Sequence, residues 1–402
     1  MKVNTGHLTY CTNIHAGKNW SEDFEALKLN FPVIKNTISP DEEMGLGLRL
    51  SNEASLDLEN EGSLAVFKAW LEENKAYVFT MNGFPYGEFH HTVVKEDVHT
   101  PDWTTSSRRD YTIRLFKILK ELLPAGMDGG ISTSPLSYRH WFKTNNDLEA
   151  AVNAATFHII DVVKELIHIY NTTGVVMHLD IEPEPDGILE TGREFIDWYE
   201  GTLYRLAIPV IESSFKVSAE KATSLLQQHL CLCYDVCHFA IGYEDHEAVV
   251  EELNRKHLKV GKIQISAALK AEMQRSAEDK VSLGRSFETF NEPTSLHQVV
   301  ARKNDSSVIR YRDLPEALAD FNNKDVLEWR AHFHVPISVK EIGLLESTQD
   351  DIVEVLALQK EAPFTNHLEV ETYTWEVLPE QLKLPITQSI SNELAWVADQ
   401  LT

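Results

Sequence analysis

Short apolar runs alternate along this chain with longer stretches in which apolar residues recur at helical spacing. The stretch DLEAAVNAATFHIIDVVKELIHIY has that spacing throughout, and Gly174, a residue type that often ends helices, follows soon after it. Eight runs have the length and apolar character of strands: LTYCTNIHA, MGLGLRLS, AYVFTMNGFP, GGISTSPLS, VVMHLDIEPEP, CLCYDVCHFAIG, KIQISAAL and LEVETYTWEVLP. Strands that alternate with helices are typical of a parallel sheet, and eight such units predict a (β/α)8 TIM-type barrel.

The count of eight requires that residues from about 270 to 345 form a long excursion after the seventh strand. Most of this segment is polar and rich in turn residues, although WRAHFHVPI would by itself pass for a strand. Loops that follow barrel strands build the active site, so we expect a functional role for the excursion. The chain has no internal repeat, low-complexity tract or linker, which predicts one domain over residues 1–402.

The composition narrows the classes of partner. The chain has 402 residues and a formal net charge of -25, and a field of that sign repels phosphate backbones and anionic lipid headgroups. We therefore expect a small-molecule metabolite as partner and no nucleic acid, while a local basic pocket would still accept one small phosphate. Neither a signal-peptide core nor an apolar stretch of about 18 residues is present, which predicts a cytoplasmic protein without a membrane span.

Three of the four cysteines crowd a single apolar run. Cys231, Cys233 and Cys237 lie in C-L-C-Y-D-V-C, whereas Cys11 lies near the N-terminus. The spacing lacks the CxxC pairs of a structural zinc site. We interpret these thiols as small buried side chains rather than as metal ligands or disulfide partners.

The fifth strand ends in acidic residues. Alternation along a strand puts His178, Asp180 and Glu182 on one face, with Glu182 at the proline-marked end. A buried carboxylate is costly unless it is paired or bound to a metal ion. A single acidic residue at a strand end has a simpler interpretation, as a helix cap or the partner of an ion pair.

Similar polar groups end the next three strands. Asp235 and His238 lie where the sixth strand runs into its loop, Gln264 lies on the seventh strand, and Glu371 lies on the eighth. In a barrel these strand ends meet at one rim. Together with Glu182 they form an oxygen- and imidazole-rich set, which suits Mn²⁺, Mg²⁺, Co²⁺ or Zn²⁺ better than a soft ion.

The order Glu182, Asp235-x-x-His238, Gln264 and Glu371 resembles the xylose isomerase-like TIM barrels. That superfamily contains sugar isomerases, keto-sugar epimerases and AP-endonuclease-type enzymes. The resemblance implies metal ligation by the two glutamates, the aspartate and the strand-seven residue, and substrate binding or orientation of Asp235 by His238. The chain departs from the pattern at strand seven, where Gln264 replaces the usual His. Its neutral amide oxygen would suit a hard cation such as Mn²⁺ or Mg²⁺ and weaken a preference for Zn²⁺.

A closer resemblance covers nearly the whole chain. The segments TGHLTYCTNIHAG, GLGLRLS, VFTMNGFPYGEFH, DWTTSSRRDYT, LDIEPEPDG and YDVCHFA are similar to the EboE family, the xylose isomerase-like barrels of the Ebo metabolite-traffic gene cluster. This resemblance implies a role in moving or processing a metabolite toward the cell envelope, but it supplies no reaction. Barrels of the superfamily often form dimers or tetramers, so the resemblance is consistent with a homo-oligomer.

Further polar side chains are candidates for a substrate pocket above the metal: Asn13, His15, Asn82, His90, His91, Lys95, Arg330, His332 and His334. His90 and His91 would be extra metal ligands, as in the endonuclease branch, or belong to a solvated loop. That branch has an Asp-x-His pair after strand seven, where this chain has Arg330 and His332. The change from Asp to Arg argues against a full trinuclear zinc site.

Three functions fit these residues. The first is isomerisation or epimerisation of a small sugar-like or carbonyl metabolite, with Glu182 and Glu371 as catalytic residues and a metal that acidifies a C–H bond. The second is metal-assisted phosphoester hydrolysis, which needs further metal ions and therefore a convergence of the additional histidines. The third is a barrel that binds and hands on a metabolite without converting it.

Overall fold

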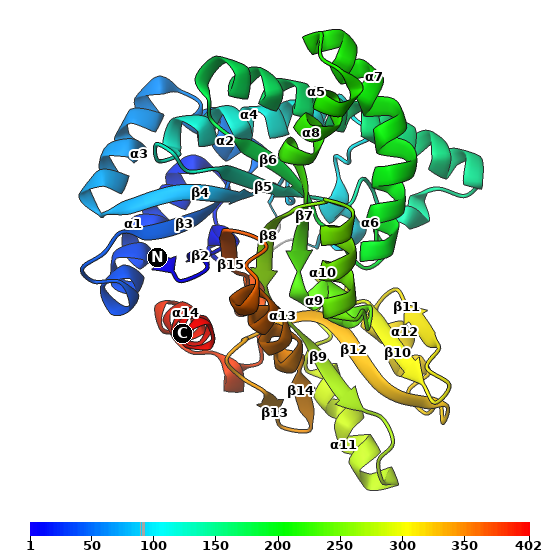
Figure 1. Ribbon diagram of the computed structural model, residues 1–402. Helices are drawn as coiled ribbons and strands as arrows, with labels where there is room; N and C mark the ends of the chain where they lie inside the picture. The colour runs from blue at the N-terminus through cyan, green and yellow to red at the C-terminus, as the bar shows by residue number, and fades with distance from the viewer. Residues whose placement is uncertain (89, 91–92) are drawn as a thin grey trace.

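The computed structural model describes residues 1–88, 90 and 93–402. Within these residues, eight parallel strands form a barrel in the order β2-β15-β8-β7-β6-β5-β4-β3. A parallel bridge between Cys11 and Gly47 closes the ring between β2 and β3, and the short β1 pairs antiparallel with β2. The strands are β1 (Lys2–Val3), β2 (Gly6–Tyr10), β3 (Met44–Arg49), β4 (Ala76–Asn82), β5 (Gly129–Thr133), β6 (Met177–Ile181), β7 (Leu230–Asp235), β8 (Val260–Ile265) and β15 (His367–Val370). The prediction of a (β/α)8 barrel is confirmed (Figure 1).

Helices cover the outside of the barrel (Figure 1). The longest, α5, begins after the N-cap Thr144 and ends at Gly174, whose φ of 76° is the left-handed conformation that glycine adopts without strain. The barrel helices are α1 (Trp20–Ile38), α2 (Asn52–Leu58), α3 (Glu61–Glu73), α4 (Ser106–Leu122), α5 (Asn145–Thr173), α6 (Gly192–Trp198), α7 (Tyr204–Phe215), α8 (Ala219–His229), α9 (Val236–Ile241), α10 (His246–Arg255), α13 (Gln349–Glu361) and α14 (Ile386–Leu401). Short single-turn or irregular helices are η1 (Thr12–Ile14), η2 (Lys95–His99), η3 (Arg139–Trp141), η4 (Tyr199–Leu203), η5 (Tyr373–Val377) and η6 (Glu380–Leu382).

The excursion after the seventh barrel strand contains much of a second sheet. The predicted strand KIQISAAL is split at Ser266, because β8 stays in the barrel while β9 enters this second sheet. Its strands are β9 (Ala267–Glu272), β10 (Val299–Lys303), β11 (Val308–Tyr311), β12 (Val326–Val335), β13 (Glu341–Ile342) and β14 (Leu345–Ser347), with α11 (Ala277–Glu288) and α12 (Leu314–Ala319) between them. The polar, turn-rich segment therefore contributes strands to an antiparallel ladder, and WRAHFHVPI is indeed largely strand, as part of β12.

The second sheet packs beside α9, next to the barrel (Figure 1). The ladder between β12 and β9 is interrupted between Ala331 and Val335. Over this stretch the backbone N–H of His332 donates instead to the carbonyl oxygen of Gln298. One cluster of buried apolar side chains includes both Leu179 of β6 and Trp329 of β12, so the barrel and the second sheet share apolar packing.

All four cysteines are free and buried, in agreement with their interpretation as small interior side chains. Within the described part of the chain, no helix combines the length and apolar character needed to cross a membrane.

Candidate metal centre

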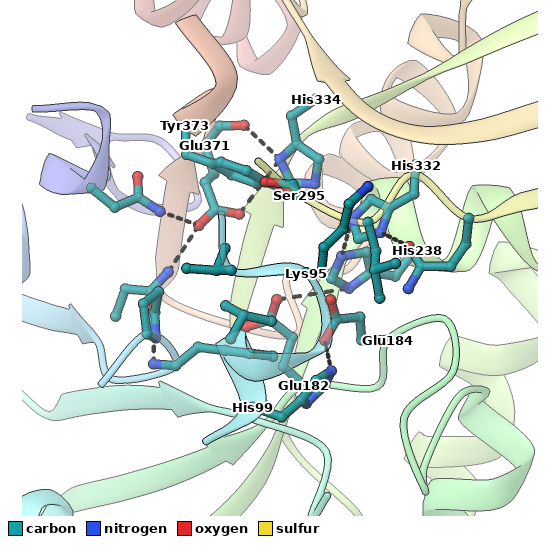
Figure 2. A pocket seen from close by; sticks show the side chains of 18 residues that line it. Lys95, His99, Glu182, Glu184, His238, Ser295, His332, His334, Glu371 and Tyr373 are labelled. Atoms are coloured by element: carbon teal, nitrogen blue, oxygen red, sulfur yellow. Dashed lines mark hydrogen bonds and ion pairs between the residues drawn. The ribbon is translucent and has the colours of Figure 1, made fainter. Parts of the chain in front are cut away.

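A cavity of about 680 Å³, counting the space open to solvent, lies at the carboxyl ends of the barrel strands. Its lining comes from the barrel strand ends, from η2 and from the second sheet (Figure 2). The residues predicted for the site that line it are Asn13, Asn82, Lys95, Glu182, His238, His332, His334 and Glu371. Figure 2 shows His238, His332 and Glu184 on one side of the cavity and Glu371, Tyr373 and His334 on another.

The strand-end carboxylates converge as the sequence pattern predicts, but Gln264 lies among them in an unexpected orientation. Its amide nitrogen lies 3.1 Å from Glu182 Oε1, 3.1 Å from Asp235 Oδ2 and 2.7 Å from Glu371 Oε2. Its amide oxygen faces away and accepts from the thiol of Cys233 at 3.2 Å. Gln264 was predicted to offer an oxygen to a metal ion, and here its N–H groups face the carboxylates. The amide thus occupies the space between the three acids as a neutral donor.

Negative charge accumulates at this point of the barrel. Burial, the charges of Glu371 and Asp235 and that of Glu184 raise the pKa of Glu182 well above its ordinary value. Burial, followed by the charge of Asp235, raises the pKa of Glu371 to about 8. Both side chains line the cavity, so two carboxyl groups with raised pKa values lie where a ligand can reach them.

Glu371 is also firmly oriented. The side-chain amides of Asn13 and Asn82 donate to its Oε1 at 2.7 and 2.8 Å. Its Oε2 accepts from Gln264, as above. The structure therefore gives both asparagines, which were predicted as substrate-binding residues, a positioning contact with a cavity carboxylate.

Asp235 is the N-cap of α9, which explains the Asp235-x-x-His238 spacing. Its Oδ1 accepts from the backbone N–H of His238 at 3.1 Å and from the hydroxyl of Ser266 at 2.7 Å. The cap fixes the first turn of α9, and this turn presents the His238 ring to the cavity.

Two imidazoles from distant parts of the chain face each other. The Nδ1–H of His238 donates to the carbonyl oxygen of Pro183, and the Nδ1–H of His332 donates to Gln298 Oε1, both at 2.9 Å. Both acceptors are carbonyl oxygens, which cannot donate a hydrogen bond, so Nδ1 of each ring must carry the proton. In the neutral ring Nε2 then holds a lone pair. These two Nε2 atoms lie 3.2 Å apart. Two lone pairs at this distance repel unless a cation or a proton lies between them.

Burial keeps these rings neutral. It lowers the pKa of His238, and together with the charge of His238 it lowers the pKa of His332 well below its ordinary value. Burial likewise lowers the pKa of His334 to about 4. Neutral imidazole is the form that ligates metals.

Glu184 completes a ligand set that sequence reasoning missed. Ligand atoms of Glu184, His238 and His332 all lie within 4.8 Å of one another, and so do those of Asp235, His238 and His334. Glu184 Oε2 and His334 Nε2 are buried without a hydrogen-bond partner, as coordination would explain. Two ligands of a tetrahedral ion with bonds of about 2.0–2.1 Å lie about 3.3 Å apart, close to the separation of the two Nε2 atoms. The residues present therefore fit a divalent ion.

The sequence did contain a signal for Glu184, because the run I-E-P-E-P places it two residues after Glu182, on the same face of an extended chain. His99, which lies 3.6 Å from Glu184 Oε2, had none, because it comes from the loop segment η2. Gln298 also lines the cavity and was not predicted.

The remaining predicted residues have other contacts. His15 pairs with the hydroxyl of Tyr10 at 3.2 Å, and His90 Nε2 lies 2.6 Å from the carbonyl oxygen of Asn13, and neither belongs to the cavity lining. Lys95 lines the cavity but donates to Asp313 at 2.7 Å. His91 lies outside the described residues.

Arg330 is likewise absent from the cavity lining, in contrast to its prediction as a substrate-binding residue. It donates to Glu328 at 2.8 Å, to Asp351 at 3.0 Å and to the carbonyl oxygen of Ala240 at 2.7 Å. Its guanidinium also lies over the ring of Tyr243, 4.4 Å from the centroid. These contacts join the second sheet to the barrel helices.

The sequence matches no protein-family model and no curated protein. Among solved structures, the chain is similar to an IolI protein with a binding zinc atom, with 13% identity, a TM-score of 0.46 and 98% of each chain covered. It is also similar to a xylose isomerase-like TIM barrel protein from Mycobacterium smegmatis in complex with magnesium, with 8% identity, a TM-score of 0.49 and 100% of each chain covered. A third is the probable 3-DHS dehydratase AsbF from Bacillus anthracis, with 8% identity, a TM-score of 0.44 and 97% of each chain covered.

Proposed function

We propose that this protein is a metal-dependent enzyme that isomerises or epimerises a small sugar-like or carbonyl metabolite. The observation that carries the proposal is the 3.2 Å separation of the His238 and His332 Nε2 atoms, whose lone pairs face each other beside a cavity with two protonatable glutamates. The resemblance of the sequence to the EboE family supports a place in a metabolite-traffic pathway.

His238, His332 and Glu184 would hold the divalent ion, and Asp235 and His334 form another candidate group with His238. Zn²⁺, Co²⁺ and Mn²⁺ accept this mixture of imidazole and carboxylate, which Mg²⁺ accepts less readily. When bound, the ion supplies Lewis acidity toward a substrate carbonyl and so acidifies the neighbouring C–H bond.

Glu371 and Glu182 are the proton-transfer residues in this proposal. A carboxyl group whose pKa lies near 8, as for Glu371, exchanges protons readily near neutral pH. Asn13 and Asn82 hold the carboxyl in one orientation and leave it open to the cavity. One glutamate would take the proton from carbon, and the other would return a proton on the opposite face or at the neighbouring atom.

The cavity favours an uncharged substrate over a phosphoester. Among the described residues that line this cavity, Lys95 is the only lysine or arginine, and Asp313 pairs with it. The acids Glu182, Glu184 and Glu371 face the same space and offer a phosphate no cationic partner. Hydroxyl and carbonyl groups, in contrast, can bond to these carboxyl groups and to the asparagine amides.

The test begins with protein purified without a metal-chelating tag, reloaded with Zn²⁺ or Mn²⁺ and analysed for metal by mass spectrometry. His238→Gln/His332→Gln should bind one ion fewer per chain than the wild type, and His15→Gln, which alters a buried histidine outside the cavity, should bind as many. Wild type and Glu371→Gln are then incubated with aldoses, ketoses and hydroxyketones in D₂O. Deuterium at a substrate carbon that depends on Glu371 supports the enzyme, whereas tight binding without exchange would favour the carrier. An unchanged metal count in the double variant would exclude this centre.

A further inference from the structure

A second group of metal-binding side chains lies at the opposite end of the barrel. Asp128 directly precedes β5, His178 is the second residue of β6, and His367 is the first residue of β15. The strands are parallel, so their amino ends meet at the end of the barrel away from the cavity. One ligand atom from each residue lies within 4.8 Å of the other two.

The separations in this group suit a shared ion better than direct hydrogen bonds. His178 Nε2 lies 3.7 Å from Asp128 Oδ2, and His367 Nε2 lies 3.6 Å from Asp128 Oδ1. The ring centroids of the two histidines are 5.1 Å apart. Ligand atoms of a tetrahedral ion lie about 3.3 Å apart, which small side-chain adjustments would reach here.

His367 provides an independent observation. It is 1% exposed, and neither of its ring nitrogens has a hydrogen-bond partner. A buried polar atom without a partner costs roughly 1–3 kcal/mol, so native proteins rarely leave one without a reason. Nε2 faces Asp128, and a bound ion would satisfy it.

His178 already has the support that metal-binding histidines usually have. Its Nδ1 lies 2.6 Å from Oδ1 of the fully buried Asp180, which leaves Nε2 directed at Asp128. A carboxylate behind the ligating ring fixes its tautomer and orientation. Asp128 itself is 37% exposed, which gives an ion a route from solvent.

We propose that Asp128, His178 and His367 form a second, structural metal site that takes a divalent ion, with zinc favoured by the two imidazoles and one carboxylate. Water would complete a tetrahedral set. The ion would join β15 to β6, two strands that β7 and β8 separate in the sheet, and thereby brace the floor of the barrel. The site shares no residue with the proposed catalytic centre, so each can fail without the other.

A simpler arrangement would use the same residues without metal. Protonated His178 between Asp128 and Asp180 is an ion-pair network that needs no ion. The two alternatives differ in zinc stoichiometry, which makes the experiment decisive.

Metal-free protein is loaded with excess Zn²⁺, passed through a desalting column and analysed for zinc by mass spectrometry. The wild type should retain two ions per chain, and Asp128→Asn should retain one. The control variant Asp41→Asn, which alters an exposed acid near the amino ends of the strands, should retain two. The double variant His238→Gln/His332→Gln should retain the ion bound by Asp128, His178 and His367. Zinc should also raise the Tm of that double variant, and adding Asp128→Asn to it should abolish the rise. Equal zinc retention and an equal rise in Tm with and without Asp128→Asn would overturn the proposal.

Anomalous diffraction at the zinc edge tests the site in the unaltered chain. Zinc-soaked wild-type crystals should show a peak bounded by Asp128, His178 and His367. A structure with zinc beside His238 and His332 but none beside Asp128, His178 and His367 would refute this inference while leaving the proposed function intact.

Discussion

The Nε2 atoms of His238 and His332 face each other at 3.2 Å, although 94 residues separate them in the chain. Each ring is anchored through Nδ1 to a carbonyl oxygen, one from the backbone of Pro183 and one from the side chain of Gln298. The anchoring contacts orient the lone pairs before any ion arrives. Binding therefore requires little rearrangement of these rings.

Gln298→Ala should weaken metal binding without removing a ligand. Loss of its carbonyl frees the His332 ring to rotate and to change tautomer, and such outer partners are worth about 10–100-fold in affinity. Titration calorimetry with Zn²⁺ on metal-free protein measures the change. Ser295→Ala, another cavity-lining substitution, is the matched control and should bind as the wild type does. Equal affinity in both variants would contradict the anchoring role.

Glu371→Gln should abolish proton transfer and spare the metal. The amide keeps the shape of the side chain but cannot take a proton, and loss of a general acid–base group costs about 10²–10⁴-fold in rate. The measurement is deuterium exchange into the substrate identified in the screen, together with metal content. A variant that loses metal along with activity would instead make Glu371 a ligand, as the family resemblance implies.

Arg330→Ala should destabilise the fold and leave the metal count unchanged. The substitution takes this partner from Asp351 and Glu328, which keep His246 and Arg302, and loss of a hydrogen bond between charged groups costs about 1.5–3 kcal/mol. Urea denaturation gives the loss in the free energy of unfolding, and mass spectrometry gives the metal. If stability stayed the same while substrate affinity fell, the sequence-based prediction of substrate binding would be the better one.

Stability should depend on pH through Glu393 of α14. This carboxyl accepts from the backbone N–H of Ile337 and the hydroxyl of Thr372, yet burial raises its pKa from 4.5 to about 7. Between these two values the unfolded chain releases the proton while the folded chain keeps it, so stability falls as pH rises. The contribution is on the order of 3 kcal/mol over the window.

Glu393→Gln should flatten that dependence, because the amide cannot ionise. Urea denaturation at pH 4.5 and at pH 7.5 compares the two proteins, and Glu376→Gln serves as a control on another carboxyl of the C-terminal segment. A slope that Glu393→Gln leaves unchanged would assign the pH dependence to other groups.

Much of the barrel can be predicted from local pattern. Strand-length apolar runs and helical spacing locate all eight barrel strands, and Gly174 marks the end of α5 because few other residue types adopt its backbone conformation without strain. The split of KIQISAAL at Ser266 could not be predicted, since both halves are equally apolar and only their partners differ.

The sequence by itself determined that acidic, imidazole and amide groups end four neighbouring strands, because alternation and parallel strands bring such ends to one rim. Only the tertiary structure decided that His332 comes to His238, through a strand of a second sheet whose ladder breaks at that point. Only the tertiary structure turned the Gln264 nitrogen toward three carboxylates. Local sequence sets period and strand ends, whereas packing between distant segments sets which donor meets which acceptor.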